Sequence, residues 1–165
     1  MHRTVFAAFD ELCTAYACGG NVLEIGAVPT GDSLLCLPSL RHASRRIGVN
    51  LDGPCHGPGF DVVCGNGNSL PQDHGFADDT FDTVPCNAVL EHDRFFWKTL
   101  AEMKRVARPG GVIGIGVPMG RQPCATMVST AMSPLVVALS PTVPVSLTSD
   151  RTGASGRSEE HTSEL

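Results

Sequence analysis

The stretch NVLEIGAVPTGDSLL, residues 21–35, decides the fold of this chain. Residues 21–26 are an apolar run that ends at a glycine, which is typical of a buried parallel strand followed by a tight turn. A glycine at this place lets the backbone approach a ligand closely, and the residues after it offer N–H groups to an anion. Val28, Pro29 and Thr30 then stand where a nucleotide-binding loop usually carries more glycines. The stretch predicts a ligand-binding βα turn, with an ordinary βα turn as the alternative.

Apolar runs and turn residues alternate on either side of that stretch. Helices are predicted at residues 6–18, in part of 33–46, where Pro38 must kink the helix or start it late, and at 93–108. Strands are predicted at residues 21–26, 47–51, 61–64, 80–87 and 112–117, although Pro85 cannot donate to a sheet ladder. The stretch GPCHGPG after the second strand is expected to be a loop. This alternation predicts an α/β fold, a Rossmann-like doubly wound parallel sheet of five strands between two layers of helices.

Residues 120–165 differ in kind from the residues before them. Arg121 is the one charged residue between positions 120 and 149, and within this segment only residues 134–139 have the pattern of a strand. We find no pattern of a hairpin there. The final RSEEHTSEL resembles the translation of a common sequencing adapter, and a charged disordered tail is the alternative. We expect an α/β domain at residues 1–119 and a poorly ordered or artefactual tail at 120–165.

Composition excludes several functional classes. The formal net charge of −5, without a cluster of Lys and Arg, argues against nucleic-acid binding. Seven cysteines without a C-x-x-C pair indicate free thiols in a reducing cytoplasm rather than a metal site. The first residues lack the pattern of a signal peptide, and no apolar run is long enough to cross a bilayer. We therefore expect a cytoplasmic protein without metal and without stable membrane insertion.

Polar residues follow two of the predicted strands. Ligands of α/β sheets bind beyond the carboxyl ends of the strands. Asn50 and Asp52 close the second strand, where a nucleotide-binding fold places a carboxylate on ribose hydroxyls, and they would face one side if the strand reaches that far. Asn66 and Asn68 follow the third strand, where their amides would read an adenine edge. The alternative for all four is ordinary turn chemistry.

Five motifs in order resemble those of class I S-adenosylmethionine-dependent methyltransferases: VLEIG, GVNLD, GNGNSLP, FADDTFDTVPCNAVLEH and LAEMKRVARPGGVIGIGVP. The resemblance is closest to the type that modifies small molecules or lipids, and it covers roughly residues 20–118. It implies an enzyme that uses S-adenosylmethionine to methylate a small-molecule or lipid acceptor. Since the family completes its sheet with an antiparallel hairpin, we expect a truncated or fragmentary member. The sequence leaves the oligomeric state open.

The resemblance also assigns roles to individual residues. Glu24 and Gly26 would lie near the methionine end of the cofactor, and Thr30 and Gly31 would grip it in place of the missing glycines. Further cofactor positions implied by the resemblance are Asn50 at the ribose with Asp52 as its stand-in, Asn66 at the adenine, and Asn87 or Ala88 beside the methionine and the acceptor.

Two departures from the family bear on binding. Asn50 and Asn66 stand where the family usually has acids, so each forfeits a charge-assisted hydrogen bond worth roughly 1 kcal/mol. His92 is the motif-placed candidate for a general base, and a structural histidine is its alternative. A non-catalytic Rossmann-like fragment or pseudoenzyme without cofactor binding is the competing hypothesis for the whole chain. An NAD-binding domain is disfavoured because G-x-G-x-x-G is absent.

Overall fold

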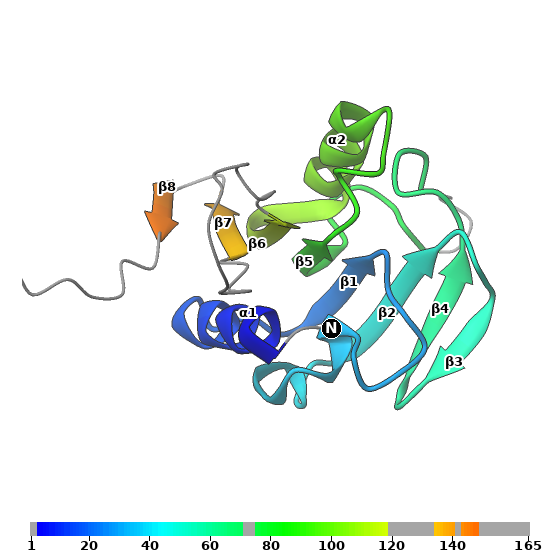
Figure 1. The fold of residues 1–165 in the computed structure, drawn as a ribbon, viewed down its shortest axis with the longest axis horizontal. Helices are drawn as coiled ribbons and strands as arrows, with labels where there is room; N and C mark the ends of the chain where they lie inside the picture. The colour runs from blue at the N-terminus through cyan, green and yellow to red at the C-terminus, as the bar shows by residue number, and fades with distance from the viewer. Residues whose placement is uncertain (1–2, 71–74, 119–133, 141–142, 149–165) are drawn as a thin grey trace, which may run out of the picture.

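A computed structural model of the chain describes residues 3–70, 75–118, 134–140 and 143–148. The helices of this part are α1 (Arg3–Ala15) and α2 (Phe96–Val106), with short 3-10 helices η1 (Leu34–Cys36) and η2 (Pro38–Leu40). The strands are β1 (Asn21–Ile25), β2 (Arg45–Asn50), β3 (Cys55–Gly57), β4 (Phe60–Cys64), β5 (Phe81–Asn87), β6 (Ala107–Pro118), β7 (Pro134–Ser140) and β8 (Val143–Thr148) (Figure 1).

The strands form one mixed sheet in the order β3-β4-β2-β1-β5-β6-β7-β8. The five strands β4, β2, β1, β5 and β6 run parallel, which confirms the predicted Rossmann-like core, whereas β3, β7 and β8 are antiparallel additions. The chain leaves β1 toward β2 and β4 and later returns to the other side of β1 as β5. The order therefore reverses between β1 and β5, the place where open α/β sheets bind ligands.

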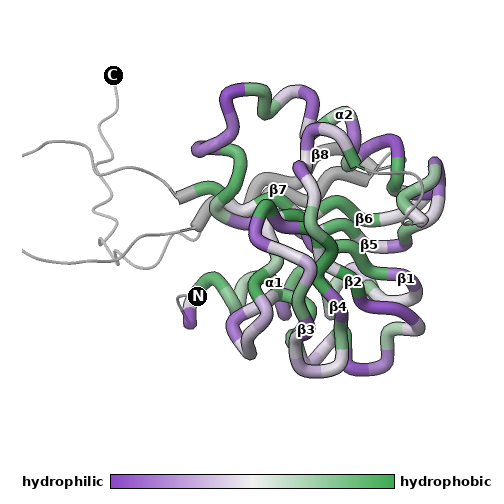
Figure 2. Tube along the Cα trace, turned by 90° about the vertical axis from the view of Figure 1, so that its right-hand side faces the viewer, coloured by the Kyte–Doolittle hydropathy of each residue, from purple (hydrophilic) through white to green (hydrophobic). Residues whose placement is uncertain are grey.

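Apolar side chains fill both faces of the sheet. Alternate residues of β1 take part in different clusters: Val22 packs with Phe9 of α1 and with the η1 and η2 leucines, whereas Leu23 packs with Met103 and Val106 of α2. Figure 2 shows that hydrophobic stretches run through the middle strands and hydrophilic ones through many of the connections. This arrangement leaves the carboxyl ends of the central strands for a site.

The helices differ from their predicted bounds for local reasons. α1 ends at Ala15 rather than residue 18, because Ala17 already has a φ of 49°. Between residues 33 and 46 only η1 and η2 form, since the proline at 38 holds Leu37 in an extended conformation with ψ 135°. α2 begins at Phe96 rather than residue 93, because residues 93–95 form a turn in which the carboxylate of Asp93 accepts from Phe95 N.

Two predictions about strands were wrong. The expected loop GPCHGPG contains β3, which pairs with β4 in a hairpin whose members Gly57 and Phe60 lie opposite each other. A hairpin also forms where none was predicted, since β7 pairs with β6 and β8 with β7. Both segments carry prolines and lack an Asn-Gly or Asp-Gly turn, so the usual hairpin signals were missing. The rest of 120–165 lies outside the described residues, and the boundary at 119 stays a prediction.

Pro85 lies inside β5 after all. It pairs with Gly114 of β6, while the ladder from β5 to β1 is registered at Val22↔Thr83 and Ile25↔Cys86, on either side of the proline. The missing N–H is therefore accommodated within the central sheet. Cys64, expected inside an apolar strand, ends β4 with an exposed side chain.

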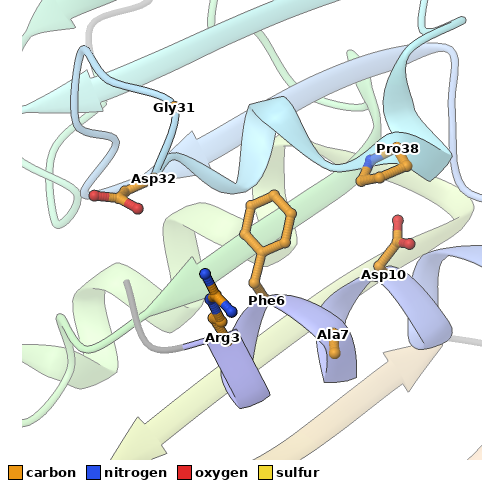
Figure 3. A pocket seen from close by; sticks show the side chains of 7 residues that line it. All are labelled: Arg3, Phe6, Ala7, Asp10, Gly31, Asp32 and Pro38. Carbon is orange, nitrogen blue, oxygen red and sulfur yellow. The ribbon is translucent and has the colours of Figure 1, made fainter.

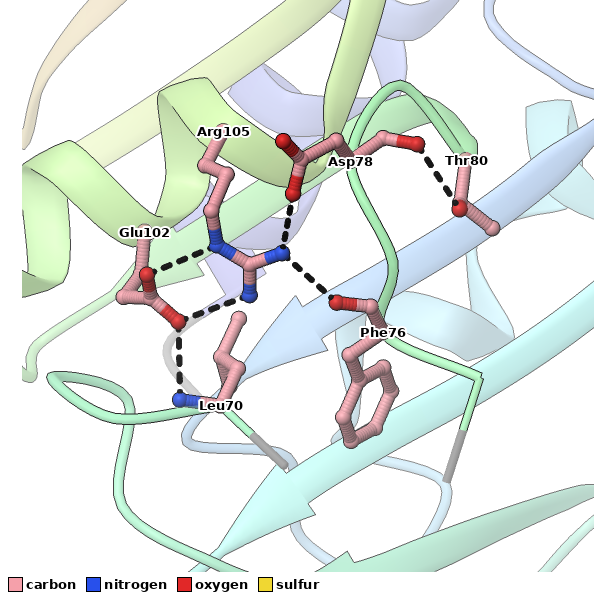
Figure 4. A network of polar contacts seen from close by, with 6 residues as sticks. All are labelled: Leu70, Phe76, Asp78, Thr80, Glu102 and Arg105. Atoms are coloured by element: carbon pink, nitrogen blue, oxygen red, sulfur yellow. Dashed lines mark hydrogen bonds and ion pairs between the residues drawn. The ribbon is translucent and has the colours of Figure 1, made fainter. Parts of the chain in front are cut away.

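A polar network around Arg105 ties α2 to the segment before β5 (Figure 4). Its guanidinium donates twice to Glu102, from Nε to Oε1 and from Nη2 to Oε2, both at 2.8 Å. Nη1 donates to Asp78 Oδ1 at 2.8 Å and to the carbonyl of Phe76 at 2.9 Å, while Leu70 N donates to Glu102 at 2.9 Å. The guanidinium holds the pKa of Glu102 below its ordinary value. Arg105, which belongs to the motif LAEMKRVARPGGVIGIGVP, thus has a structural role.

Replacing Arg105 by glutamine is expected to lower the free energy of unfolding by about 2 kcal/mol, because it leaves the half-buried carboxylate of Glu102 without its main partner. Arg108→Gln is the matched control, since Arg108 is 57% exposed and pairs with Asp82. Its cost should stay below about 1 kcal/mol. Urea unfolding of both variants measures the difference, and equal losses would contradict a special role for the Arg105 network.

Candidate functional site

Three strand ends meet where the strand order reverses. Gly26 N and Ala27 N, directly after β1, both donate to the carbonyl of Val49 in β2, at 2.8 and 3.2 Å. The carboxamide of Asn50 donates from Nδ2 to the carbonyl of Ala27 at 2.8 Å. Ala88 N, after β5, donates to the carbonyl of Gly116 at 3.0 Å. The side chain of Asn50, which the sequence predicts to bind cofactor, thus joins the turn after β1 to the end of β2.

The position of Gly26 requires both a positive φ and the absence of a side chain, and only glycine satisfies both. Its φ is +80°, in the left-handed region. A Cβ atom at this position would also overlap Cγ2 of Val89, from the loop after β5. The glycine therefore permits both the turn and the close approach of the neighbouring loop.

Glu24 lies beneath this turn and not on its open side. Only 3% of the residue is exposed. Its carboxylate accepts hydrogen bonds from the Ser33 hydroxyl, from Leu34 N at 3.2 Å and from Leu35 N at 3.3 Å. Burial raises the pKa of Glu24 to about 7. Glu24 thus ties β1 to the start of η1 and fixes the course of residues 27–33.

The outer part of the turn carries Thr30 and Gly31, both exposed. Thr30 Oγ1 accepts from Asp32 N at 3.3 Å, which closes a small local turn. A Cβ atom at Gly31 would meet nothing within 4 Å, so there is open space beside it. Gly31, but not Thr30, lines a cavity.

That cavity has a volume of about 420 Å³ and lies between α1 and the turn (Figure 3). Its lining residues are Arg3, Phe6, Ala7, Asp10, Gly31, Asp32 and Pro38. Asp10 also accepts from Ser39 N at 2.9 Å, which holds η2 against the helix. Sequence reasoning missed the α1 contribution. The signal was the spacing i, i+3, i+4, i+7 of residues 3, 6, 7 and 10, which puts them on one helix face.

Asp52 and Asn66 lie apart from the turn contacts. β2 ends at Asn50, so the strand does not reach Asp52, which lies in an exposed turn. The side chain of Asn66 is exposed, and its Oδ1 accepts from Asn68 N at 3.1 Å. Turn chemistry therefore accounts for the position of Asn66.

Asn87 ends β5, and His92 lies within the loop that follows it. Asn87 is half-buried against Gly116 of β6. The side chain of His92 is 81% exposed, and its Nε2 lies 3.9 Å from Glu91 Oε1. A histidine this exposed lacks the close partner that usually orients a general base.

Other kinds of site are not formed by the described residues. Within residues 3–70 and 75–118 no three His, Cys, Asp or Glu side chains gather closely enough to hold a metal ion. The six cysteines of this part are free thiols. None of the described helices is long and apolar enough to cross a membrane.

Comparison with known sequences points to one family. A family model described as a methyltransferase domain matches residues 34–115. The match therefore begins after β1 and the turn at Gly26. An "uncharacterized methyltransferase" of Mycobacterium sp. (strain JLS) is 33% identical over 100 residues, which are 57% of this chain and 37% of the relative. The aligned part of the chain thus spans well under half of that relative's length.

Solved structures agree with the fold. A SAM-dependent methyltransferase from Aquifex aeolicus superimposes with a TM-score of 0.55 at 16% identity, over 72% of this chain and 68% of that one. The YcgJ protein from Bacillus subtilis gives a TM-score of 0.56 at 22% identity, over 68% and 50%. These structures show the fold alone; together with the reversal of strand order at β1, the family-model match over residues 34–115 and the mycobacterial relative support a class I S-adenosylmethionine-dependent methyltransferase domain in this chain.

Proposed function

We propose that this protein transfers a methyl group from S-adenosylmethionine to a small-molecule or lipid acceptor. The observation that carries the proposal is the bond from Asn50 to Ala27, which joins the carboxyl ends of β2 and β1 beside the point where the strand order reverses, within a methyltransferase domain. It supports a preformed edge between β1 and β2, where this family holds its cofactor. The net charge of −5 favours acceptors other than nucleic acid.

The residues at this edge fit such a cofactor. The cavity beside Gly31 has the size of a small-ligand site, and it combines one guanidinium with two carboxylates. Arg3 would pair with the carboxylate of the methionine end, and Asp10 or Asp32 with its ammonium group. Glu24 would act from beneath, by holding the turn in place.

The other proposed contacts with the cofactor and the acceptor involve residues at the carboxyl ends of the strands. Asn50 would face the ribose with Asp52 nearby, Asn66 would approach the adenine from its exposed turn, and Asn87 would border the acceptor. These roles rest on the family resemblance and on the position of each residue at the carboxyl ends of β2, β4 and β5.

The chemistry needs little from the chain beyond placement. S-adenosylmethionine supplies a methyl group already activated on a sulfonium, so alignment with the acceptor accounts for much of the acceleration. The chain would orient the reactants and exclude water around them. His92 would take a proton only from an acceptor that reaches its exposed position. We also propose a cytoplasmic location, in keeping with the six free cysteines of the described part.

A non-catalytic domain is the second candidate. It is favoured by Val28, Pro29 and Thr30 in place of glycines, and by the use of Asn66 Oδ1 within its own turn. Such a domain would keep the fold without cofactor affinity.

Calorimetry of the full chain with S-adenosylhomocysteine separates the two candidates. We expect binding heat with S-adenosylhomocysteine and none with NADH. Failure to detect heat or a thermal shift at about millimolar ligand, a binding free energy near 4 kcal/mol, would overturn the enzyme proposal for this chain.

Asn50→Asp tests the site further. The family pattern alone predicts tighter binding from an acid at this position. The structure predicts the reverse, because an aspartate has no donor for the Ala27 carbonyl and would set two acceptors against each other. We expect the free energy of unfolding to fall by about 1–3 kcal/mol and S-adenosylhomocysteine binding to weaken. Asp52→Asn, in the exposed turn, is the control without an expected stability change. Tighter binding at unchanged stability would contradict the bond to Ala27.

A further inference from the structure

Three consecutive aromatic residues lie open at the start of α2. Phe95, Phe96 and Trp97 are 47%, 46% and 54% exposed. Their rings meet edge to face, with centroids 5.6 Å apart for Phe95 and Trp97 and 5.5 Å apart for Phe96 and Trp97. The three rings, here called the aromatic patch, therefore form one continuous apolar surface. Surfaces of this kind mark interaction sites more often than isolated exposed residues do.

The fold holds the patch outward. α2 buries Thr99, Met103 and Val106 against the rest of the domain. Asp93 fixes the start of the helix, since its carboxylate accepts from Phe95 N at 2.8 Å and from the Thr99 hydroxyl at 2.6 Å. The patch cannot turn inward without breaking these contacts.

Cationic side chains border the patch. Arg94 and Lys98 flank it in sequence and are exposed, and Lys98 Nζ lies 5.2 Å from the centroid of the Phe95 ring. Lys104 is exposed farther along α2. The one acidic residue of α2, Glu102, bonds to Arg105 and to a backbone N–H.

Acidic groups near the patch are few and largely engaged. Asp93 has its pKa held below the ordinary value by the Thr99 hydroxyl; one of its oxygens accepts from Thr99 of α2 and the other from Phe95 N, directly before the helix. Glu91 lies beside His92, with its side chain 22% exposed. The exposed cations Arg94 and Lys98 thus lie beside the rings, while the carboxylate of Asp93 is hydrogen-bonded within the domain.

We propose that the aromatic patch docks the protein onto an anionic lipid surface. Rings of Trp and Phe settle at the level of lipid headgroups, while Arg94 and Lys98 meet the lipid phosphates. A second copy fits less well, because pairing patch to patch would bring the cations of both copies together. The contact is reversible surface binding, since it involves three half-exposed rings and no membrane-spanning segment.

The patch also lies on the rim of the proposed site. The loop that leads to it starts at the carboxyl end of β5, and Val89 of that loop packs on Gly26. α2 then runs back to β6, which is parallel to β5, so the amino end of α2 lies at the same edge of the sheet. Docking would therefore turn this edge toward the lipid. The inference itself is independent of methyl transfer, because vesicle binding is measured without turnover.

Trp97 provides a direct measurement, because it is the only tryptophan in the chain. The full chain is titrated with vesicles of mixed phosphatidylserine and phosphatidylcholine, and separately with phosphatidylcholine alone. We expect a blue shift of the fluorescence and cosedimentation with the anionic vesicles only, weakened severalfold by high salt. The double variant Phe95→Ser/Phe96→Ser keeps the reporter and should bind at least about tenfold more weakly.

Two further variants sharpen the result. Arg94→Gln/Lys98→Gln should remove the preference for anionic vesicles, and Tyr16→Ser, a change at an exposed aromatic residue near the amino end of β1, should leave binding unchanged. Equal binding to neutral vesicles, or no shift with anionic ones, would overturn the proposal. A blue shift that grows with protein concentration in the absence of lipid would overturn it too, in favour of a second copy covering the patch.

Discussion

Gly26→Ala is expected to lower the free energy of unfolding by about 3 kcal/mol and to abolish binding of S-adenosylhomocysteine. A φ of +80° costs an alanine about 1 kcal/mol relative to glycine. The added Cβ also overlaps Val89 Cγ2, and such overpacking typically costs 1–3 kcal/mol. Moving either the turn or the Val89 loop would disturb the edge where β1, β2 and β5 end. Urea unfolding and calorimetry measure the two effects.

The same substitution five residues later is the matched control. Gly31 lies in the same turn, but its φ is outside the left-handed region and a Cβ there meets nothing within 4 Å. Gly31→Ala should leave stability unchanged or raise it slightly, by less than about 1 kcal/mol. In the double variant Gly26→Ala/Val89→Ala, the stability lost through the overlap with Val89 should be recovered, whereas the stability lost through the positive φ of the alanine should remain lost. A Gly26→Ala protein as stable as the parent would contradict the conformation of the turn.

The parallel core was predictable because its strands are buried on both faces. β1 and residues 112–117 of β6 read as nearly continuous apolar runs, whereas β2 and β5 carry shorter apolar stretches, and both patterns can be recognised without knowing the neighbouring strands. Residues 134–139 of β7 had the pattern of a strand, whereas β3 and β8 carried no such signal. They pair at the edges of the sheet, where the backbone of the neighbouring strand, rather than the residue's own side chain, decides the conformation.

The site was predictable in position more than in detail. The closeness of Asn50 to the Gly26 turn follows from two parallel strands that end at one edge of the sheet. The hydrogen bond from Ser33 to Glu24 could not be predicted from the sequence, because it depends on how residues 27–33 fold back over β1. The cavity beside Gly31 depends on the packing of α1, which no local pattern specifies.

Glu24 should make the stability of the protein depend on pH. Burial raises its pKa from the ordinary 4.5 to about 7, so the folded chain holds the proton more tightly than the unfolded chain does. The free energy of unfolding contributed by Glu24 therefore falls as pH rises between these two values. Above pH 7 the ionised carboxylate costs the fold its full penalty, roughly 3 kcal/mol.

Glu24→Gln isolates this contribution, since a glutamine keeps the shape and an acceptor for the N–H groups of η1 without a titrating proton. Urea unfolding from about pH 5 to pH 8 should show the variant gaining stability on the parent as pH rises, by roughly 3 kcal/mol in all. Asp93→Asn is the control, because the pKa of Asp93 is lowered from 3.8 and its contribution is lost only below that value, so the offset of this variant from the parent should stay constant between pH 5 and pH 8. Parallel curves for Glu24→Gln and the parent would mean that Glu24 is ionised in both states. Its carboxylate would then be open to water or to a cofactor, instead of closed beneath the turn.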